Sequence, residues 1–184
     1  MKPFIHTFSA IIFSAAFAAN AADFSVESPT LKTGTHLLDA QVLNGFGCSG
    51  QNRSPAISWK NAPKGTKSFA ITLYDPDAPT GSGWWHWVVY NIPRSTSGLP
   101  EDAGKADGTK LPQGAVQGRT DFGAPGYGGA CPPAGDKPHH YIVTVSALDV
   151  EKIDLPADAS AAMVGFMMHA HRIAVASLSA EYSR

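Results

Sequence analysis

Apolar and polar residues alternate with a period of two along several stretches of this chain, which is the pattern of β-strands that bury one face. The clearest cases are residues 68–74 and 141–148. A third run, 85–92, is aromatic and β-branched and ends at Pro93, as strands in the interior of a sheet often do. Further strands are expected at 24–28, 37–43, 57–59 and 175–182. The pattern predicts a mainly β protein.

One segment has a helical period instead. Its apolar residues are spaced i, i+3, i+4 and i+7, which places them on one stripe of a helix. Pro156 followed by Asp158 or Ser160 is a typical helix start. The stripe consists of Met163, Phe166, Met167 and Ala170. We therefore expect a single helix near the C-terminus.

Two segments are too rich in turn-forming residues to be regular structure. Residues 44–55 contain glycine, asparagine and serine, which indicates a loop. Residues 94–138 form a long irregular stretch, and such stretches are usually either functional or disordered. Phe122 and Tyr127 within it favour an ordered loop with a function.

Residues 1–21 resemble a signal peptide. Lys2 precedes an apolar run over 8–19, and Ala19-Asn20-Ala21 is a small-x-small cleavage site. The apolar run is shorter than the ~20 residues needed to cross a bilayer, so no transmembrane anchor is expected. Residues 22–184 are then one exported domain of ordinary size.

The charge balance argues against nucleic acid as a partner. The chain has 14 basic and 15 acidic residues, and loss of Lys2 with the signal peptide leaves 13 against 15. Nucleic-acid binding depends on an excess of basic residues, which is absent here. The two cysteines, Cys48 and Cys131, are predicted to form a disulfide because exported proteins mature in oxidising compartments. Two buried free thiols are the alternative.

Candidate polar groups gather next to the predicted strands. Asp75 and Asp77 follow the strand at 68–74, His86 lies in the run at 85–92, and His139 and Tyr141 lie at the start of the last clear strand, pointing to one face. A carboxylate favours the charged form of a nearby histidine, so two imidazoliums and a tyrosine hydroxyl predict an oxyanion pocket.

Two other interpretations of the same residues remain. Asp75 and Asp77 could serve only to shape the DPDAP turn through bonds to the main chain. Alternatively, Asp75, His86 and His139 could hold a metal, because two histidines and a carboxylate are a known ligand set. The protein would then be a metal-assisted hydrolase. The chain has no GxSxG sequence, and cysteines joined in a disulfide cannot act as nucleophiles, so other catalytic classes find no support.

Three motifs in order, DPDAP, WWHWVVYNIP and DFGAPGYGGACPPAGDKPHHY, resemble the phosphatidylethanolamine-binding proteins, also called Raf-kinase-inhibitor-like proteins. The likeness is greatest to the bacterial YbhB/YbcL branch and its periplasmic type. It implies a Greek-key antiparallel β-sandwich with a helix near the C-terminus, a periplasmic location, a homodimer and a cis peptide before Pro79.

The resemblance also implies a pocket for a small anion such as a phosphate group. The leading interpretation is therefore a non-enzymatic binding protein without a cofactor or metal, which acts by presenting this site to a partner protein. Carried over one by one, the expected ligand-binding residues are Asp75, Asp77, Trp84, His86, Gly129, Cys131, Pro133, His139 and Tyr141.

Overall fold

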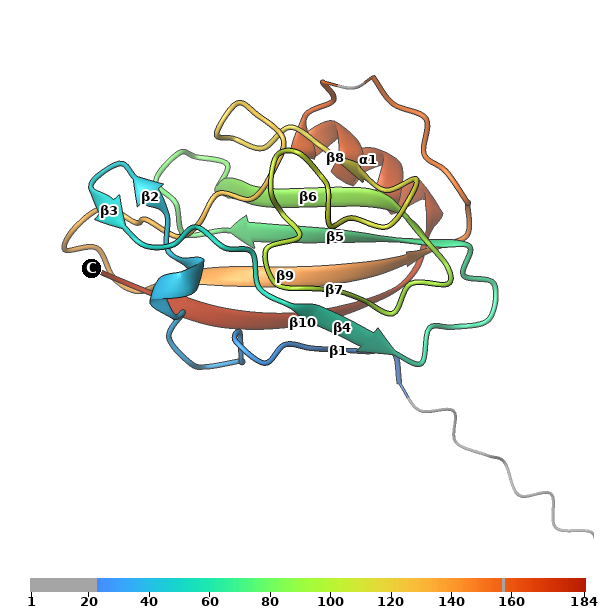
Figure 1. Ribbon diagram of the computed structural model, residues 1–184, viewed down its shortest axis with the longest axis horizontal. Coiled ribbons are helices and arrows are strands. Elements are labelled where there is room, and N and C mark those ends of the chain that lie inside the picture. The colour runs from blue at the N-terminus through green and yellow to red at the C-terminus, as the bar shows by residue number, and fades with distance from the viewer. Residues whose placement is uncertain (1–22, 157) are drawn as a thin grey trace, which may run out of the picture.

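The computed structural model describes residues 23–156 and 158–184 and shows a mainly β domain with one α-helix (Figure 1). The predicted signal peptide lies outside the described residues. Most helices and strands fall where the sequence pattern places them. The strands are β1 Ser25–Glu27, β2 Asn44–Gly45, β3 Cys48–Ser49, β4 Ile57–Lys60, β5 Ser68–Asp75, β6 Trp84–Pro93, β7 Gly98–Leu99, β8 Val116–Gln117, β9 His139–Leu148 and β10 Arg172–Tyr182. The helices are the 3₁₀ helix η1 Asp39–Gln41 and the α-helix α1 Ala161–His171.

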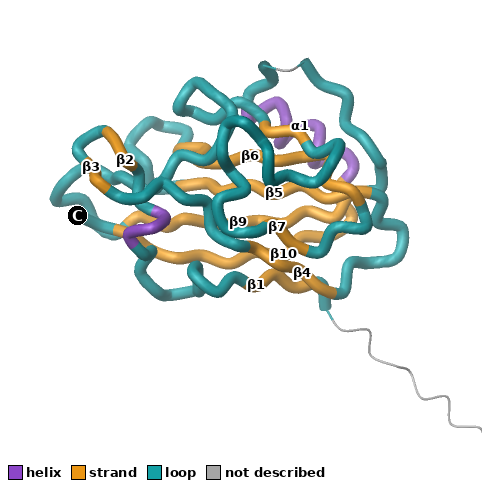
Figure 2. Tube along the Cα trace, viewed as in Figure 1, coloured by secondary structure: helices purple, strands orange, loops and turns teal. Residues whose placement is uncertain are grey.

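Two antiparallel sheets form the body of the domain. The larger has the strand order β10-β9-β5-β6-β8, and the smaller has the order β1-β4-β7. Strands β2 and β3 form a separate short hairpin at one end of the molecule (Figure 2). The predicted antiparallel sandwich is confirmed, with the C-terminal helix in its expected place.

The hydrophobic core lies between the two sheets. Alternate residues of β5, β6 and β9 point into it, among them Phe69, Trp87 and Val143, and the small sheet contributes Trp59 and Leu99. Each of these side chains is at most 3% exposed. Burial of large apolar side chains of this kind contributes about 1.5–3 kcal/mol each, so this layer holds the sheets together.

Helix α1 covers the opposite face of the large sheet. It begins after Ser160, whose hydroxyl accepts a hydrogen bond from the Met163 amide at 3.2 Å. The helix buries Ala161, Val164 and Met168 against the sheet. Most of the stripe identified from the sequence faces outward instead, since Met163 is 49% and Phe166 76% exposed, and only Met167 packs against the buried cluster. Both sides of this helix are apolar, so periodicity identified the helix but not its buried side.

Two local predictions are wrong. Residues 37–43 do not form a strand but contain η1, where the Gln41 carbonyl accepts hydrogen bonds from the Ala130 amide and the Tyr127 hydroxyl. These groups, remote in sequence, provide the hydrogen bonds that a neighbouring strand would otherwise provide. The peptide before Pro79 is trans, as no cis bond occurs in the described residues. The Asp75 carboxylate shapes this turn by accepting from the amides of Asp77 and Ala78.

Within residues 23–156 and 158–184, no helix is long and apolar enough to span a bilayer.

Candidate binding pocket

The candidate site lies at one end of the large sheet, where β5 ends and the antiparallel strands β6 and β9 begin. Consecutive β5 residues Leu73 and Tyr74 pair with Trp87 and Trp85, so β6 carries one extra residue between these partners, His86. A bulge of this kind changes the direction of a side chain. The bulge accounts for Trp85 and Trp87 packing on opposite faces of the large sheet, while His86 lines one cavity together with Trp84.

Asp75, the last residue of β5, fixes the geometry of this end of the sheet. One carboxylate oxygen accepts from two amides of the following turn, and the other lies 2.8 Å from His139 Nδ1. The residue is only 2% exposed. Since a buried carboxylate must be paired, Asp75 orients both the turn and the His139 ring. Asp75 therefore shapes the DPDAP turn, as one interpretation of the sequence suggested, and it lines the cavity as well.

His139 lies between two carboxylates. Its Nδ1 contacts Asp75, and its Nε2 is 3.4 Å from an Asp136 carboxylate oxygen. Both ring nitrogens thus already face negative charge within the protein. The ring lines the cavity, but it is not a free pair of donors as the sequence had suggested.

His86 is buried, and its Nδ1 lies 2.8 Å from the Gly128 carbonyl. A carbonyl can only accept, so Nδ1 carries the hydrogen. Burial lowers the pKa of His86 below its ordinary value, and this outweighs the opposing effects of the Gly128 carbonyl and the Asp75 charge. The prediction of an imidazolium at His86 is wrong, because desolvation is stronger than the attraction of the carboxylate. The ring is neutral at pH 7.

Tyr141 supplies a hydroxyl group without a partner. The residue is wholly buried, and no hydrogen bond in the described residues reaches its oxygen. Burial raises the pKa of Tyr141 well above its ordinary value, and the nearby Asp75 charge raises it further. The group therefore remains protonated and able to donate. The His86 and Tyr141 rings meet edge to face with centroids 5.2 Å apart.

These side chains border a cavity of about 230 Å³ whose remaining wall is mostly apolar. Seven of the nine predicted residues line it. They are Asp75, Trp84, His86, Cys131, Pro133, His139 and Tyr141. The other lining residues are Leu43, Phe46, Ala78, Pro79, Thr80, Phe122 and Pro132.

Two aromatic residues of this wall were not among the predicted site residues. Phe122 packs against Trp84, His86 and Phe46, with ring centroids 5.3, 5.5 and 6.2 Å away. Phe46, at the tip of the β2–β3 hairpin, is 77% exposed. Apolar residues in loops carry no periodic signal, so only the presence of aromatics in glycine-rich segments could have suggested them.

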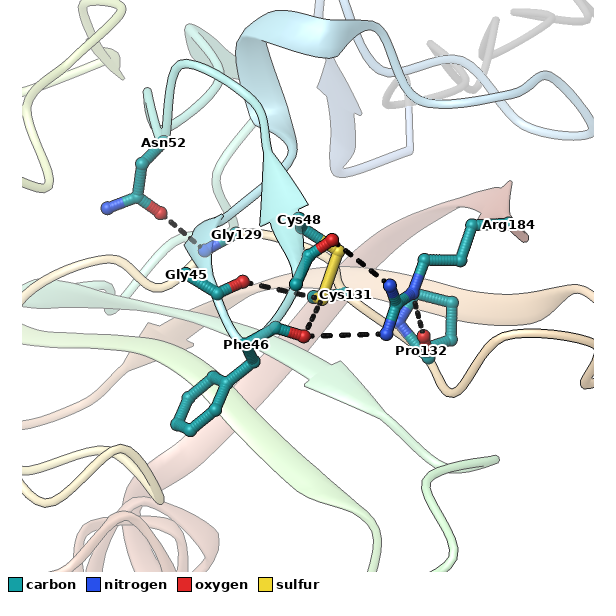
Figure 3. The surroundings of a disulfide bond; sticks show 9 residues. Gly45, Phe46, Cys48, Asn52, Gly129, Cys131, Pro132 and Arg184 are labelled. Atoms are coloured by element: carbon teal, nitrogen blue, oxygen red, sulfur yellow. Dashed lines mark hydrogen bonds between the residues drawn. A yellow bond between two sulfur atoms is a disulfide. The ribbon is translucent and has the colours of Figure 1, made fainter.

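A disulfide holds this wall together. Cys48 and Cys131 are bonded, as predicted, and join the β2–β3 hairpin to the segment before β9 (Figure 3). The Arg184 guanidinium joins the same two segments, donating to the Pro132 carbonyl at 2.6 Å and to the Gly47 carbonyl at 3.2 Å. Both connections fix residues that line the cavity.

Gly129 and Asp77 lie outside the cavity lining. The Gly129 amide donates to the Asn52 side chain at 2.7 Å, and a side chain at this position would collide with the main chain of residues 41–43. Gly129 therefore serves close packing. The neighbouring Ala130 amide is also occupied, by the Gln41 carbonyl. The main-chain amides of Gly129 and Ala130 thus have partners within the protein.

Asp77 pairs with His140 on the surface, where its carboxylate accepts from the His140 amide at 2.8 Å and contacts Nδ1 at 2.7 Å. Partial burial raises the pKa of Asp77, but the hydrogen bonds and positive charge of His140 outweigh it, so the net shift is downward. The hydrogen bond from Asp77 raises the pKa of His140. This pair is a surface ion pair beside the pocket.

The geometry gives no support to the metal-assisted alternative. No group of three or more histidine, cysteine, aspartate or glutamate side chains in the described part of the chain is arranged to hold a metal ion. Asp75 and His139 are bonded to each other, and His86 directs Nδ1 to the main chain.

A family model described as phosphatidylethanolamine-binding protein matches residues 30–183, nearly the whole described chain. The chain belongs to this family. Among curated proteins it is 56% identical to the UPF0098 protein YbcL of Escherichia coli K12 over 174 residues, covering 95% of both chains. It is 53% identical to YbhB of the same organism over 156 residues, covering 85% of this chain and 98% of YbhB.

Solved structures of family members have the same fold. The crystal structure of E. coli YbcL, described as a new member of the mammalian PEBP family, matches with a TM-score of 0.87 and 58% identity, covering 89% of this chain and 99% of YbcL. The homologue CT736 from Chlamydia trachomatis matches with a TM-score of 0.73 and 30% identity, over 90% of this chain and 99% of CT736. The predicted family is confirmed.

Proposed function

We propose that this protein is an exported, periplasmic binding protein without catalytic activity, and that its pocket binds a small phosphorylated or other oxyanionic ligand. The observation that carries the proposal is the buried Tyr141 hydroxyl without a partner. Leaving such a group unsatisfied costs about 1–3 kcal/mol, which a ligand oxygen would recover. The family name, phosphatidylethanolamine-binding protein, agrees with a phosphate-containing ligand.

The size and lining of the cavity support a small ligand rather than a long acyl chain. A volume of about 230 Å³ lies below the ~300–1,000 Å³ of drug-sized pockets. Its wall is mostly apolar and includes Phe46, Phe122 and Trp84, and polar groups in apolar surroundings have a stronger electrostatic effect than in water. A ligand held there would be presented beside the exposed Phe46, which suits recognition by a partner protein or a second copy of the chain.

Calorimetric titration with inorganic phosphate tests the site. We expect phosphate to bind to the protein and the His86→Ala variant to bind about tenfold more weakly or worse. His140→Ala is the matched control, since His140 is outside the cavity lining, and its affinity should stay unchanged. Equal affinity in wild type and His86→Ala, or no phosphate binding at all, would contradict the proposal.

Two further measurements address export and catalysis. Sequencing the N-terminus of protein taken from the periplasm should give Ala22 as the first residue. Metal analysis of the same material should find no stoichiometric metal. A bound metal, together with a hydrolytic activity lost in His86→Ala, would establish the enzyme instead.

A further inference from the structure

Two residues that line the cavity, His86 and Tyr141, have polar atoms with opposite hydrogen-bonding roles. The Tyr141 hydroxyl is protonated and has no partner, so it can donate. His86 uses its Nδ1 hydrogen on the Gly128 carbonyl, and no hydrogen bond in the described residues reaches its Nε2. In a neutral ring this second nitrogen carries a lone pair and can only accept.

The other titratable side chains of the cavity are already occupied. Asp75 is an acceptor occupied by His139 and by the turn, and His139 faces a carboxylate at each ring nitrogen. The charged groups that act on His86 are Asp75 and Asp121, both negative. Asp121 is itself occupied by the Trp85 amide at 2.8 Å. Among the titratable side chains of the cavity, an entering anion therefore meets one free donor, the Tyr141 hydroxyl, and one free acceptor, His86 Nε2, with two carboxylates nearby.

We infer that the pocket selects an oxyanion that still carries an O–H group, donating this hydrogen to His86 Nε2 while another oxygen accepts from the Tyr141 hydroxyl. Hydrogen phosphate and the monoanion of a phosphomonoester have this chemistry. Sulfate and phosphodiesters have no such hydrogen, so their oxygens would face the Nε2 lone pair. The inference rests on the proposed function and specifies which anions that site prefers.

A ligand without the hydrogen can bind only if His86 first takes up a proton from solution. Protonation places a donor on Nε2 and removes the conflict between lone pairs. Sulfate affinity should therefore rise as the pH falls, by about tenfold per pH unit while His86 is neutral in the free protein. Hydrogen phosphate brings its own proton, so its binding should involve no net uptake at pH 8.

The experiment is calorimetry at pH 8.0 and 6.0 with inorganic phosphate, sulfate and dimethyl phosphate, in two buffers of different ionisation enthalpy. Hydrogen phosphate and sulfate match in charge and nearly in size, so the O–H group is the main difference between them. Dimethyl phosphate stands in for the diester of an intact phospholipid headgroup. At pH 8.0 we expect phosphate to bind about ten- to a hundredfold more tightly than sulfate or dimethyl phosphate. Sulfate binding should be accompanied by the uptake of about one proton. The difference in affinity between phosphate and sulfate should become smaller at pH 6.0.

A matched pair of variants identifies the titrating group. In His86→Gln the amide can turn either a donor or an acceptor toward the ligand, so the preference and the proton uptake should both disappear. His171→Gln, at the opposite end of β9 beside Asp149, should behave as wild type. Should either variant fail to fold, the proton count on the unaltered protein still decides.

Each result has a distinct meaning. Equal affinity for phosphate and sulfate at pH 8.0 without proton uptake would overturn this inference while leaving an anion-binding site. Tight, proton-independent binding of dimethyl phosphate would also overturn it and would point to phospholipid headgroups. Failure of all three probes to bind at both pH values would overturn the proposed function itself.

Discussion

A tyrosine hydroxyl that is wholly buried and unpaired imposes a cost on the fold, and Tyr141 is such a residue. We predict that Tyr141→Phe leaves the free energy of unfolding unchanged or raises it by up to about 1–2 kcal/mol, because it removes an unsatisfied group. The same variant should bind phosphate about tenfold more weakly.

Tyr127→Phe is the control for this prediction. The Tyr127 hydroxyl donates to the Gln41 carbonyl at 2.7 Å and lies outside the pocket lining. Its removal should cost about 1 kcal/mol of stability and leave phosphate affinity unchanged. Urea denaturation and calorimetry on both variants measure the two effects. A stability loss in Tyr141→Phe with normal affinity would show that this hydroxyl is structural.

The Asp77–His140 pair predicts a pH dependence of stability. The raised pKa of His140 gives stability that is complete below about pH 6.5 and lost as the pH rises through its folded-state pKa. The lowered pKa of Asp77 gives stability present above about pH 4 and lost in stronger acid. Since both side chains are at least 40% exposed, the pair contributes no more than about 1 kcal/mol.

His140→Ala should therefore reduce the free energy of unfolding slightly at pH 5.5 and leave it unchanged at pH 9. Denaturation in urea at both pH values measures this difference. An equal loss at the two pH values would mean that His140 contributes by packing and not by its charge.

At the scale of whole elements, α1 offers two methionines of equal size on opposite sides. Met168 is 4% exposed and packs on the large sheet, whereas Met163 is 49% exposed. Met168→Ala should cost about 2–3 kcal/mol because it leaves a cavity, and Met163→Ala should cost less than about 0.5 kcal/mol. Thermal unfolding of the two variants measures the contrast. Similar losses would mean that the outward side of α1 is covered in solution.

The strands that could be predicted are those with a strong local pattern. Strands β5, β6 and β9 alternate clearly or carry β-branched runs, and their positions were predicted within a few residues. Residues 37–43 also looked like a strand, but Gln41 is bonded to Tyr127 and Ala130, and contacts so remote in sequence leave no local signal. Which side of α1 faces the sheet could not be predicted for a different reason, because both sides of the helix are apolar.

The residues of the site could likewise be predicted only in part. Asp75, His86, His139 and Tyr141 could be predicted to converge because each stands at the end of a recognisable strand. The hydrogen-bonding state of the two histidines could not, since it depends on the Gly128 carbonyl and on Asp136, whose positions follow from loop geometry. Sequence therefore indicated the residues, and structure was needed to tell donors from acceptors.

For the whole molecule, the disulfide is the main covalent constraint. Cys48 and Cys131 are 83 residues apart, and closing a loop of this length corresponds to about 4–5 kcal/mol in the chain-entropy model. We predict a loss of roughly this size on reduction, measured by denaturation with and without reductant. Phosphate affinity should fall too, because Phe46 and Cys131 line the pocket on either side of the bond.

Arg184→Gln helps to interpret that result. It removes the second connection between the same two segments without changing the redox state. If the hydrogen bonds of Arg184 maintain the wall once the disulfide is reduced, reducing the Arg184→Gln variant should weaken phosphate binding strongly. The loss of binding free energy should exceed the sum of the losses caused by reduction alone and by the substitution alone. Affinity that is insensitive to reduction in both proteins would show that the disulfide stabilises the fold without shaping the pocket.

The pocket draws its lining from residues between Leu43 and Tyr141, brought together only by the complete arrangement of sheets and loops. The unfolded chain therefore has no binding site for the ligand. Any compound that binds in the cavity must then stabilise the folded domain. At a concentration a hundred times its dissociation constant, it raises the free energy of unfolding by about 2.7 kcal/mol. Melting temperature alone can thus report the physiological ligand from a mixed collection of metabolites, before any biological pathway is known.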